Sequence, residues 1–156
     1  MKQTTSQTEK LIESWELPEH GEKLYAADAV IEAYIKGKKE GLEHKEKLFF
    51  KQLTENLDKS GANTKKTIEC LKSIGVTPLS AHLKANSFHD FYVLVTVSEE
   101  DFLKESFIKA YDFTEELEQS TSEDLYSISF SFINKTPHFN EKALSSDGFI
   151  FTFKQL

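Results

Sequence analysis

The stretch Phe91-Tyr92-Val93-Leu94-Val95-Thr96-Val97 decides the fold. Its two alternating sets of side chains are both apolar, which is typical of a central strand covered on both faces. Before this stretch, as far as Asn86, apolar residues recur at the three- and four-residue spacing of helices. The period of the apolar pattern therefore changes near residue 88, from a helical to an extended one.

The chain after this strand predicts a helix and two further strands. Ser98, with Asp101 three residues later, resembles the capping box that begins a helix, and buried positions recur as far as Leu117. A second strand then alternates an apolar set, Tyr126, Ile128, Phe130 and Phe132, with a serine set, Ser127, Ser129 and Ser131. The long intervening helix predicts that the first two strands are parallel through a right-handed crossover. Residues 149–153 predict a last strand, which could run antiparallel beside either of the first two strands.

The chain before residue 87 predicts only helices. Leu11, Ile12 and Trp15 fall on one side of a short helical segment, and a longer helix is expected over 22–57, with apolar residues from Leu24 to Leu57. Gly61 with Asn63 predicts its stop. Another helix is expected from Thr64, closed by Gly75 as a left-handed cap, and Thr77-Pro78 is interpreted as the first turn of a short helix that continues through Leu83.

These elements predict an α+β fold in which N-terminal helices pack with a small mixed β-α-β-β sheet unit. Residues 1–86 form the helical region and residues 87–156 the sheet unit, which are expected to make one compact domain. One crossover helix leaves the opposite face of the sheet open, and the amphipathic N-terminal helices are expected to cover it. A second copy of the chain is the alternative cover for part of the helical surface, which predicts a homo-oligomer.

Composition and charge exclude several classes of protein. No apolar run approaches the roughly 20 residues that cross a bilayer, and Met1 to Lys10 carries no visible secretory signal. The single cysteine, Cys70, suits a reducing compartment, so a cytoplasmic location is expected. The chain is acidic, and residues 87–156 hold 5 Lys against 13 acids, a balance of 5 − 13 = −8. Because all 19 basic residues are lysine, specific nucleic-acid recognition by guanidinium groups is absent.

Two polar sets are the candidates for chemistry. His82, His89 and His138, with Asp90, are the set from which a metal site could be assembled, although their spacing matches no known zinc motif. Asp90, Glu99 and His89 are the candidates for a catalytic cleft near the end of the first strand. The alternative for Glu99, with Glu100 and Asp101, is that acids in a first helical turn stabilise the helix dipole. No cofactor is predicted, since phosphate-binding glycine loops are missing.

Three other features have structural alternatives that we favour. The serine row 127, 129 and 131 lacks a matching nucleophile motif and is interpreted as a solvated sheet face. Cys70 is interpreted as a small buried hydrophobe. The lysines between Lys36 and Lys51 could contact nucleic acid, but the interleaved glutamates favour a solvated helix face.

The segments Leu71-Lys72-Ser73-Ile74-Gly75-Val76 and Asp90-Phe91-Tyr92-Val93-Leu94-Val95 resemble the order of elements in minimal nucleotidyltransferase domains over residues 64–133. The resemblance implies a two-metal site held by paired aspartates. Here only Asp90 could serve as one of them, and the family's Gly-Ser pair is missing, so the resemblance implies a degenerate domain without activity.

The function predicted from the sequence is that of a non-catalytic protein-interaction or regulatory protein. Its partner is expected to be another protein, or a second copy bound through the N-terminal helices, with neither nucleic acid nor membrane involved. The alternative is a degenerate nucleotidyltransferase-like domain or a small enzyme with a cleft near the end of the first strand. Convergence of Asp90, Glu99 and a histidine in one pocket distinguishes the enzyme from the interaction protein.

Overall fold

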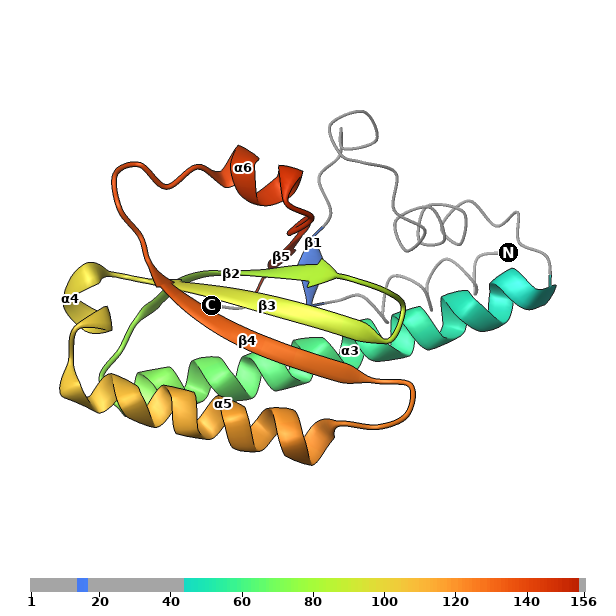
Figure 1. The fold of residues 1–156 in the computed structure, drawn as a ribbon, viewed down its shortest axis with the longest axis horizontal. Helices are drawn as coiled ribbons and strands as arrows, with labels where there is room; N and C mark the ends of the chain where they lie inside the picture. Colours follow the sequence, from blue (N-terminus) through green and yellow to red (C-terminus); the bar gives the residue numbers. More distant parts are fainter. Residues whose placement is uncertain (1–13, 17–43, 155–156) are drawn as a thin grey trace.

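A five-stranded mixed sheet with two helices on one face forms the frame of the molecule (Figure 1). The structure is a computed structural model that describes residues 14–16 and 44–154. Along the chain, the elements are β1 (Trp15–Glu16), α3 (His44–Ser73), β2 (Pro78–Ala85), β3 (Asp90–Val97), α4 (Glu99–Phe102), a 3-10 turn η2 (Glu105–Phe107), α5 (Ile108–Thr121), β4 (Ser127–Asn134), α6 (Glu141–Ser146) and β5 (Phe151–Phe153). The predicted α+β class is confirmed.

The strands lie in the order β1-β5-β2-β3-β4. β3 and β4 are parallel across the crossover that contains α4 and α5, as the sequence predicts. β2 and β3 form an antiparallel hairpin, and β5 runs antiparallel to both β2 and β1. The last strand is therefore antiparallel as expected, but the expected neighbour is wrong, because β5 pairs with β2 and β1 and not with β3 or β4.

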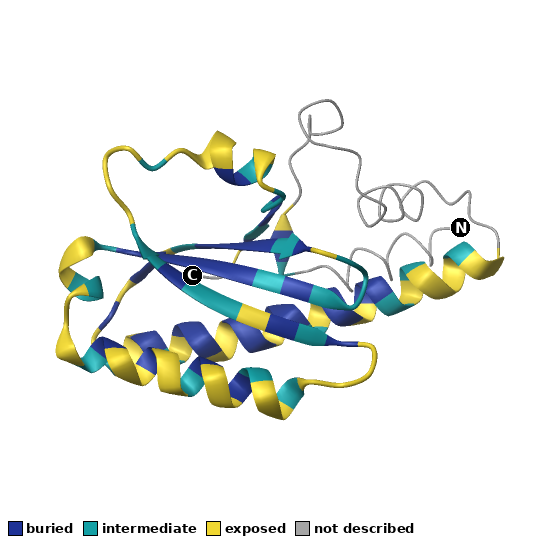
Figure 2. Cartoon of the chain, viewed as in Figure 1, coloured by how far each residue is buried: buried dark blue, intermediate teal, exposed yellow. Residues whose placement is uncertain are grey.

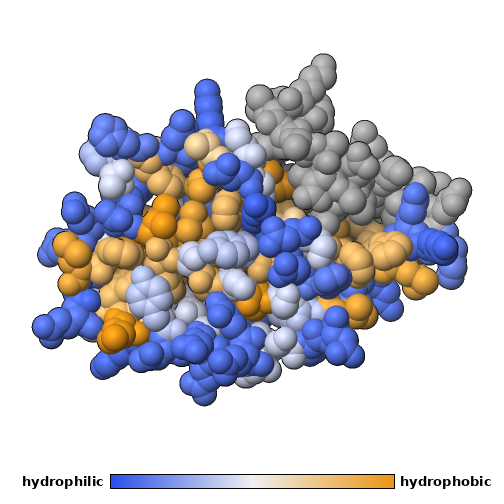
Figure 3. Space-filling view, viewed as in Figure 1, coloured by the Kyte–Doolittle hydropathy of each residue, from blue (hydrophilic) through white to orange (hydrophobic). Residues whose placement is uncertain are grey.

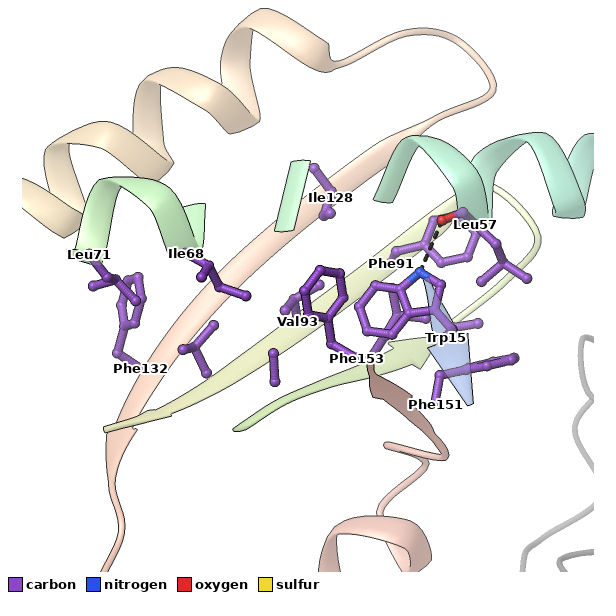
Figure 4. Close-up of a cluster of buried hydrophobic side chains, with 14 of the residues drawn as sticks. Trp15, Leu57, Ile68, Leu71, Phe91, Val93, Ile128, Phe132, Phe151 and Phe153 are labelled. Carbon is purple, nitrogen blue, oxygen red and sulfur yellow. Dashed lines mark hydrogen bonds between the residues drawn. The ribbon is translucent and has the colours of Figure 1, made fainter. Parts of the chain in front are cut away.

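One face of the sheet packs against α3 and α5, and the main core lies between them (Figure 2). Phe91, Val93, Val95 and Val97 of β3 point to this side and are fully buried. Leu57, Ile68 and Leu71 of α3 pack against them with Ile128 and Phe132 of β4, as Figure 4 shows. Apolar side chains from both ends of the described chain, including Trp15 and Phe153, complete the same cluster.

The expected stop at Gly61 and Asn63 is wrong, because α3 runs without a break from His44 to Ser73. The middle of the helix buries small and polar residues in place of large apolar ones, so its apolar spacing disappears there. Gly61 is needed for a close approach of β1. A Cβ atom at Gly61 would lie 2.5 Å from Ser14 Oγ, and the Trp15 indole donates to the Leu57 carbonyl oxygen at 3.0 Å. Gly75 follows the helix with a φ of 80°, which agrees with the expected left-handed cap.

The expected short helix through Leu83 is also wrong, because residues 78–85 form β2. Proline fits the first residue of a strand as well as the first turn of a helix. The decisive pattern is the alternation of Ala81, Leu83 and Ala85, which face the helices, with Ser80, His82 and Lys84 on the other side. Trp15 likewise lies in a strand and not in a helix. Leu11, Ile12 and the expected helix over residues 22–43 lie outside the described residues.

Of the expected N-terminal helices, the structure describes α3, which packs on the sheet but on an unexpected side. α3 lies beside α5 on the same face, so it does not cover the face opposite the crossover helix (Figure 1). That second face is partly covered by the connection between β4 and β5, which contains α6. The Phe149 ring lies 5.8 Å from the Tyr92 ring, and Leu144 of α6 is buried.

Candidate functional site

The three candidate catalytic residues lie at two different ends of β3. Asp90 begins the strand and accepts a hydrogen bond from Ser127 Oγ at 2.9 Å, and His89 precedes it in the hairpin turn. Glu99 begins α4, beyond the other end of the strand. An eight-residue strand spans roughly 25 Å, so the structure places His89 beside Asp90 but does not bring Glu99 to them.

The candidate metal ligands are also separated. His82 lies within β2 and is 5% exposed, His89 is half-buried in the hairpin turn, and His138 is exposed in the connection between β4 and β5. Within residues 14–16 and 44–154, no three His, Cys, Asp or Glu side chains come together in a group that could hold a metal ion. In that part of the chain Asp90 belongs to no such group, so the two-metal site implied by the resemblance to nucleotidyltransferases gains no support.

His82 belongs to a small polar cluster on the second face of the sheet. Its Nε2 atom lies 2.9 Å from Ser80 Oγ, which in turn lies 2.6 Å from Thr96 Oγ1. Burial lowers the pKa of His82, an effect that the charge of Glu141 opposes and that of Lys135 adds to. The lowered pKa favours the neutral imidazole at neutral pH, hydrogen-bonded as expected of a structural histidine.

The serine row of β4 lies on this second face, as the alternation predicts. Ser131 Oγ is hydrogen-bonded to the Tyr92 hydroxyl, Ser127 Oγ bonds Asp90, and Ser129 is exposed. Two of the three hydroxyls therefore have partners across the sheet, which supports the interpretation as a polar sheet face.

Cys70 is half-buried and borders a shallow depression of about 470 Å³ between α3 and α5. Lys66, Glu69, Ser73 and Phe113 complete its lining. Burial raises the pKa of the Cys70 thiol, so the thiolate that would act as a nucleophile is disfavoured.

The crossover between β3 and β4 is strongly acidic. Residues 98–126 hold 2 Lys and 10 acids, a balance of 2 − 10 = −8, which equals the whole excess of residues 87–156. Asp101 among these acids has a local role. Ser98 Oγ accepts from the backbone N–H of Asp101, and the Asp101 carboxylate accepts from the backbone N–H of Thr77. The hydrogen bond from Lys104, followed by that from Thr77, lowers the pKa of Asp101.

Most of the other acids project into solvent. Within the described residues, the acids of this segment that form ion pairs are Asp101, with Lys104, and Glu123, with Lys59. The exposed acids on α4, η2 and the outer side of α5 are Glu99, Glu100, Glu105, Asp112, Glu115 and Glu116. Near residue 99 the sequence pattern indicated either a catalytic cleft or stabilisation of the helix dipole, and the structure shows that the exposed acids continue along α4, η2 and α5.

Large apolar side chains are exposed among these acids. Leu103 is 73% exposed, Ile108 65% and Tyr111 45%. Figure 3 shows apolar surface, in orange, over the α4–α5 end of the molecule among hydrophilic side chains. The Tyr111 ring is held in place, since it packs edge-to-face at 5.4 Å against both Phe107 and Phe132. We call these three apolar residues and the six exposed acids the α4–α5 surface.

Comparison of the chain with protein-family models, with curated proteins and with solved structures finds no match. None of the helices described here has the length and apolar character that a membrane crossing requires. The function is therefore argued from the α4–α5 surface itself.

Proposed function

We propose that the chain is a non-catalytic interaction protein that binds a basic protein partner through the α4–α5 surface. The observation that carries the proposal is the coincidence of the −8 charge of residues 98–126 with three exposed apolar side chains on the same elements. Acids without an ion-pair partner attract a positively charged surface and speed its association. Exposed apolar side chains supply the area that a stable complex buries.

Tyr111 is the expected centre of the contact. Tyrosine is enriched among the residues that dominate binding energy, and a ring already fixed by its neighbours loses little conformational freedom on binding. Ile108 lies one helical turn before Tyr111, so both can contact one partner surface. The acids around them form the polar rim, which sets the sign of the partner's charge. Nucleic acid and anionic membrane are repelled by the same rim.

The test is site-specific photocrosslinking in the cell of origin, followed by binding measurements with the purified partner. A photoreactive residue in place of Tyr111 is expected to give an adduct with a basic protein, whereas one in place of Lys142 on α6 is not. Tyr111→Ala is then expected to weaken the measured affinity at least tenfold, roughly 1.4 kcal/mol. The matched variant Leu79→Ala on β2, another exposed large apolar residue, leaves the affinity within twofold. An acidic partner, or equal adducts at both positions, contradicts the proposal.

Self-association through the N-terminal helices is a second prediction. Leu48 and Phe49, in the first turns of α3, are 57% and 48% exposed and support it. Light scattering at micromolar concentration measures it directly, and a species of 17.9 kDa alone contradicts it. We also retain the cytoplasmic location as part of the proposal, because the thiol of Cys70 is free and a reducing compartment keeps it so.

A further inference from the structure

β4 forms one edge of the sheet, next to the α4–α5 surface (Figure 1). Its sequence, Ser127-Ile-Ser-Phe-Ser-Phe-Ile-Asn134, has neither a charged residue nor proline. Edge strands are usually protected by lysine, proline or a bulge, because their unpaired backbone groups pair readily with another strand. β4 pairs with β3 over its whole length without a register shift, so its outer edge is regular and extended.

The outward backbone groups can be identified from the pairing. The N–H of Ser127 donates to the His89 carbonyl, and the N–H of Lys135 donates to the Val97 carbonyl. Alternation along a strand then turns the even-numbered amides, those of residues 128, 130, 132 and 134, away from β3. The Phe130 N–H is directed this way, since it donates to Glu118 Oε1 of α5 at 2.6 Å. Within the described residues, the backbone N–H groups of Ile128 and Phe132 have no acceptor comparable to Glu118.

One row of α5 side chains borders this edge. Tyr111 contacts Phe132, and Glu118 bonds the backbone of Phe130. Glu115 lies between them at helical spacing and is exposed. A strand added to β4 would place every second side chain beside this row. Two carboxylates and an aromatic ring favour lysine or arginine there, through ion pairs and cation–π contacts.

The same row argues against a second copy as the added strand. Two β4 edges joined about a two-fold axis perpendicular to the sheet would set the acidic α5 of one copy beside the acidic α5 of the other. Like charges at that distance destabilise the pair. Charge complementarity therefore favours a different, basic chain.

We propose that β4 binds an extended segment of the partner as a sixth strand, and that this segment carries lysine or arginine at alternate positions. The proposal rests on the proposed function and specifies how the partner is recognised. Main-chain hydrogen bonds to β4 give the affinity, and the α5 row selects the charge. Glu118 must then release the Phe130 N–H to a carbonyl of the incoming strand.

The test uses the full chain and a synthetic nine-residue peptide in which lysine alternates with valine. The peptide is expected to bind, with hydrogen exchange of the Ile128 and Phe132 amides slowed at least tenfold. A peptide with glutamate in place of lysine is expected not to bind. Glu115→Lys is expected to weaken binding of the lysine peptide at least tenfold, whereas Glu141→Lys, the same charge change at an exposed position on α6, weakens it less than threefold.

Two N-methylated forms of the lysine peptide distinguish strand addition from charge attraction. One is methylated at alternate backbone nitrogens and the other at the intervening ones, so that only one form loses the N–H groups that face β4. One form is expected to lose binding and the other to keep it. Equal binding by both forms, or no binding of the lysine peptide at millimolar concentration, overturns strand addition. The proposed function fails separately, if crosslinking at Tyr111 yields no basic partner.

Discussion

α3 and α5 lie side by side under one face of the sheet, yet they use their polar residues differently. α3 buries Asn56, Ser60 and Asn63, whose side chains are hydrogen-bonded to other parts of the fold. α5 buries only Ala110, Thr114 and Leu117 and turns Asp112, Glu115 and Glu116 to solvent. Polar residues on α3 therefore hold the fold together, whereas most of those on α5 are free to meet another molecule.

The Tyr126 hydroxyl illustrates the first use. It lies 3.0 Å from Ser60 Oγ and accepts from Asn63 Nδ2 at 3.0 Å, inside the core. Desolvation by burial raises the pKa of Tyr126, which the two hydrogen bonds oppose. The residue at the start of β4 is thereby fixed to the middle of α3.

The largest effect is expected for Asn56→Ala. Asn56 is fully buried, and its Nδ2 donates to the carbonyls of Phe88 and Leu125 at 2.8 Å each. Its loss leaves both carbonyls without this donor and should cost about 2–4 kcal/mol of unfolding free energy, measured by urea denaturation. Gln52→Ala removes only the Gln52 Nε2 donor to Asn56 Oδ1 at 3.0 Å and keeps both carbonyl contacts, so it should cost less. If Asn56→Ala lowers the unfolding free energy by less than about 1 kcal/mol, the polar residues of α3 do not hold the fold together in the way proposed.

Gly61→Ala should have the next largest effect. The new methyl carbon would lie 2.6 Å from Ser14 Cβ and 2.5 Å from Ser14 Oγ, so β1 must shift. Overpacking of this kind costs about 1–3 kcal/mol of unfolding free energy. The exposed neighbour gives a control, since Ala62→Ser should change the unfolding free energy by no more than about 0.5 kcal/mol. Equal results for both variants would show that β1 does not need the close approach.

A pH-dependent effect on stability is expected from His82, which lies on the sheet face opposite α3 and α5. The folded-state pKa of His82 is lowered below its ordinary value of 6.5, so the unfolded chain binds more protons as the solution becomes acidic. The contribution of His82 to stability is therefore complete above pH 6.5 and is lost as the pH falls below it. Urea midpoints between about pH 7.5 and 5.5 should decline in the wild type and decline less in His82→Gln. If the urea midpoints of the two proteins decline equally, groups other than His82 cause the pH dependence.

The smallest effect is expected on α5. Glu116→Gln and Asp112→Asn remove exposed charges that make no ion pair within the described residues, so each should change the unfolding free energy by less than about 0.5 kcal/mol. The same two variants should weaken binding of the basic partner. A destabilisation above about 1 kcal/mol would give these acids a structural role.

The sequence predicts well those elements whose large apolar residues follow a simple period. Val93 and Val95 in β3, and Ile128 and Phe132 in β4, alternate as buried strand residues should, and the capping by Ser98 is confirmed. Prediction fails where packing is local and specific. Gly61 resembles a helix stop in the sequence, but in the structure it admits β1, which comes from a distant part of the chain.

The α4–α5 surface could be found in part. The charge of residues 98–126 is visible in the sequence, because this segment holds 10 acids and 2 lysines. The sequence does not show that Ile108 and Tyr111 are exposed, because the apolar stripe of a helix does not indicate which residues at its margin remain in contact with solvent. The outward edge of β4 depends on strand order, which follows from pairing between distant segments.

Trp15 gives the molecule an internal reporter. It is the chain's single tryptophan, 3% exposed, with its ring 5.3 Å from that of Phe153. Intrinsic fluorescence therefore follows the docking of β1 on β5 and α3, while circular dichroism follows the helices. Coincident transitions in the two signals would place the short N-terminal strand in the same cooperative unit as the rest of the sheet. An earlier change in fluorescence would identify it as a segment that detaches first.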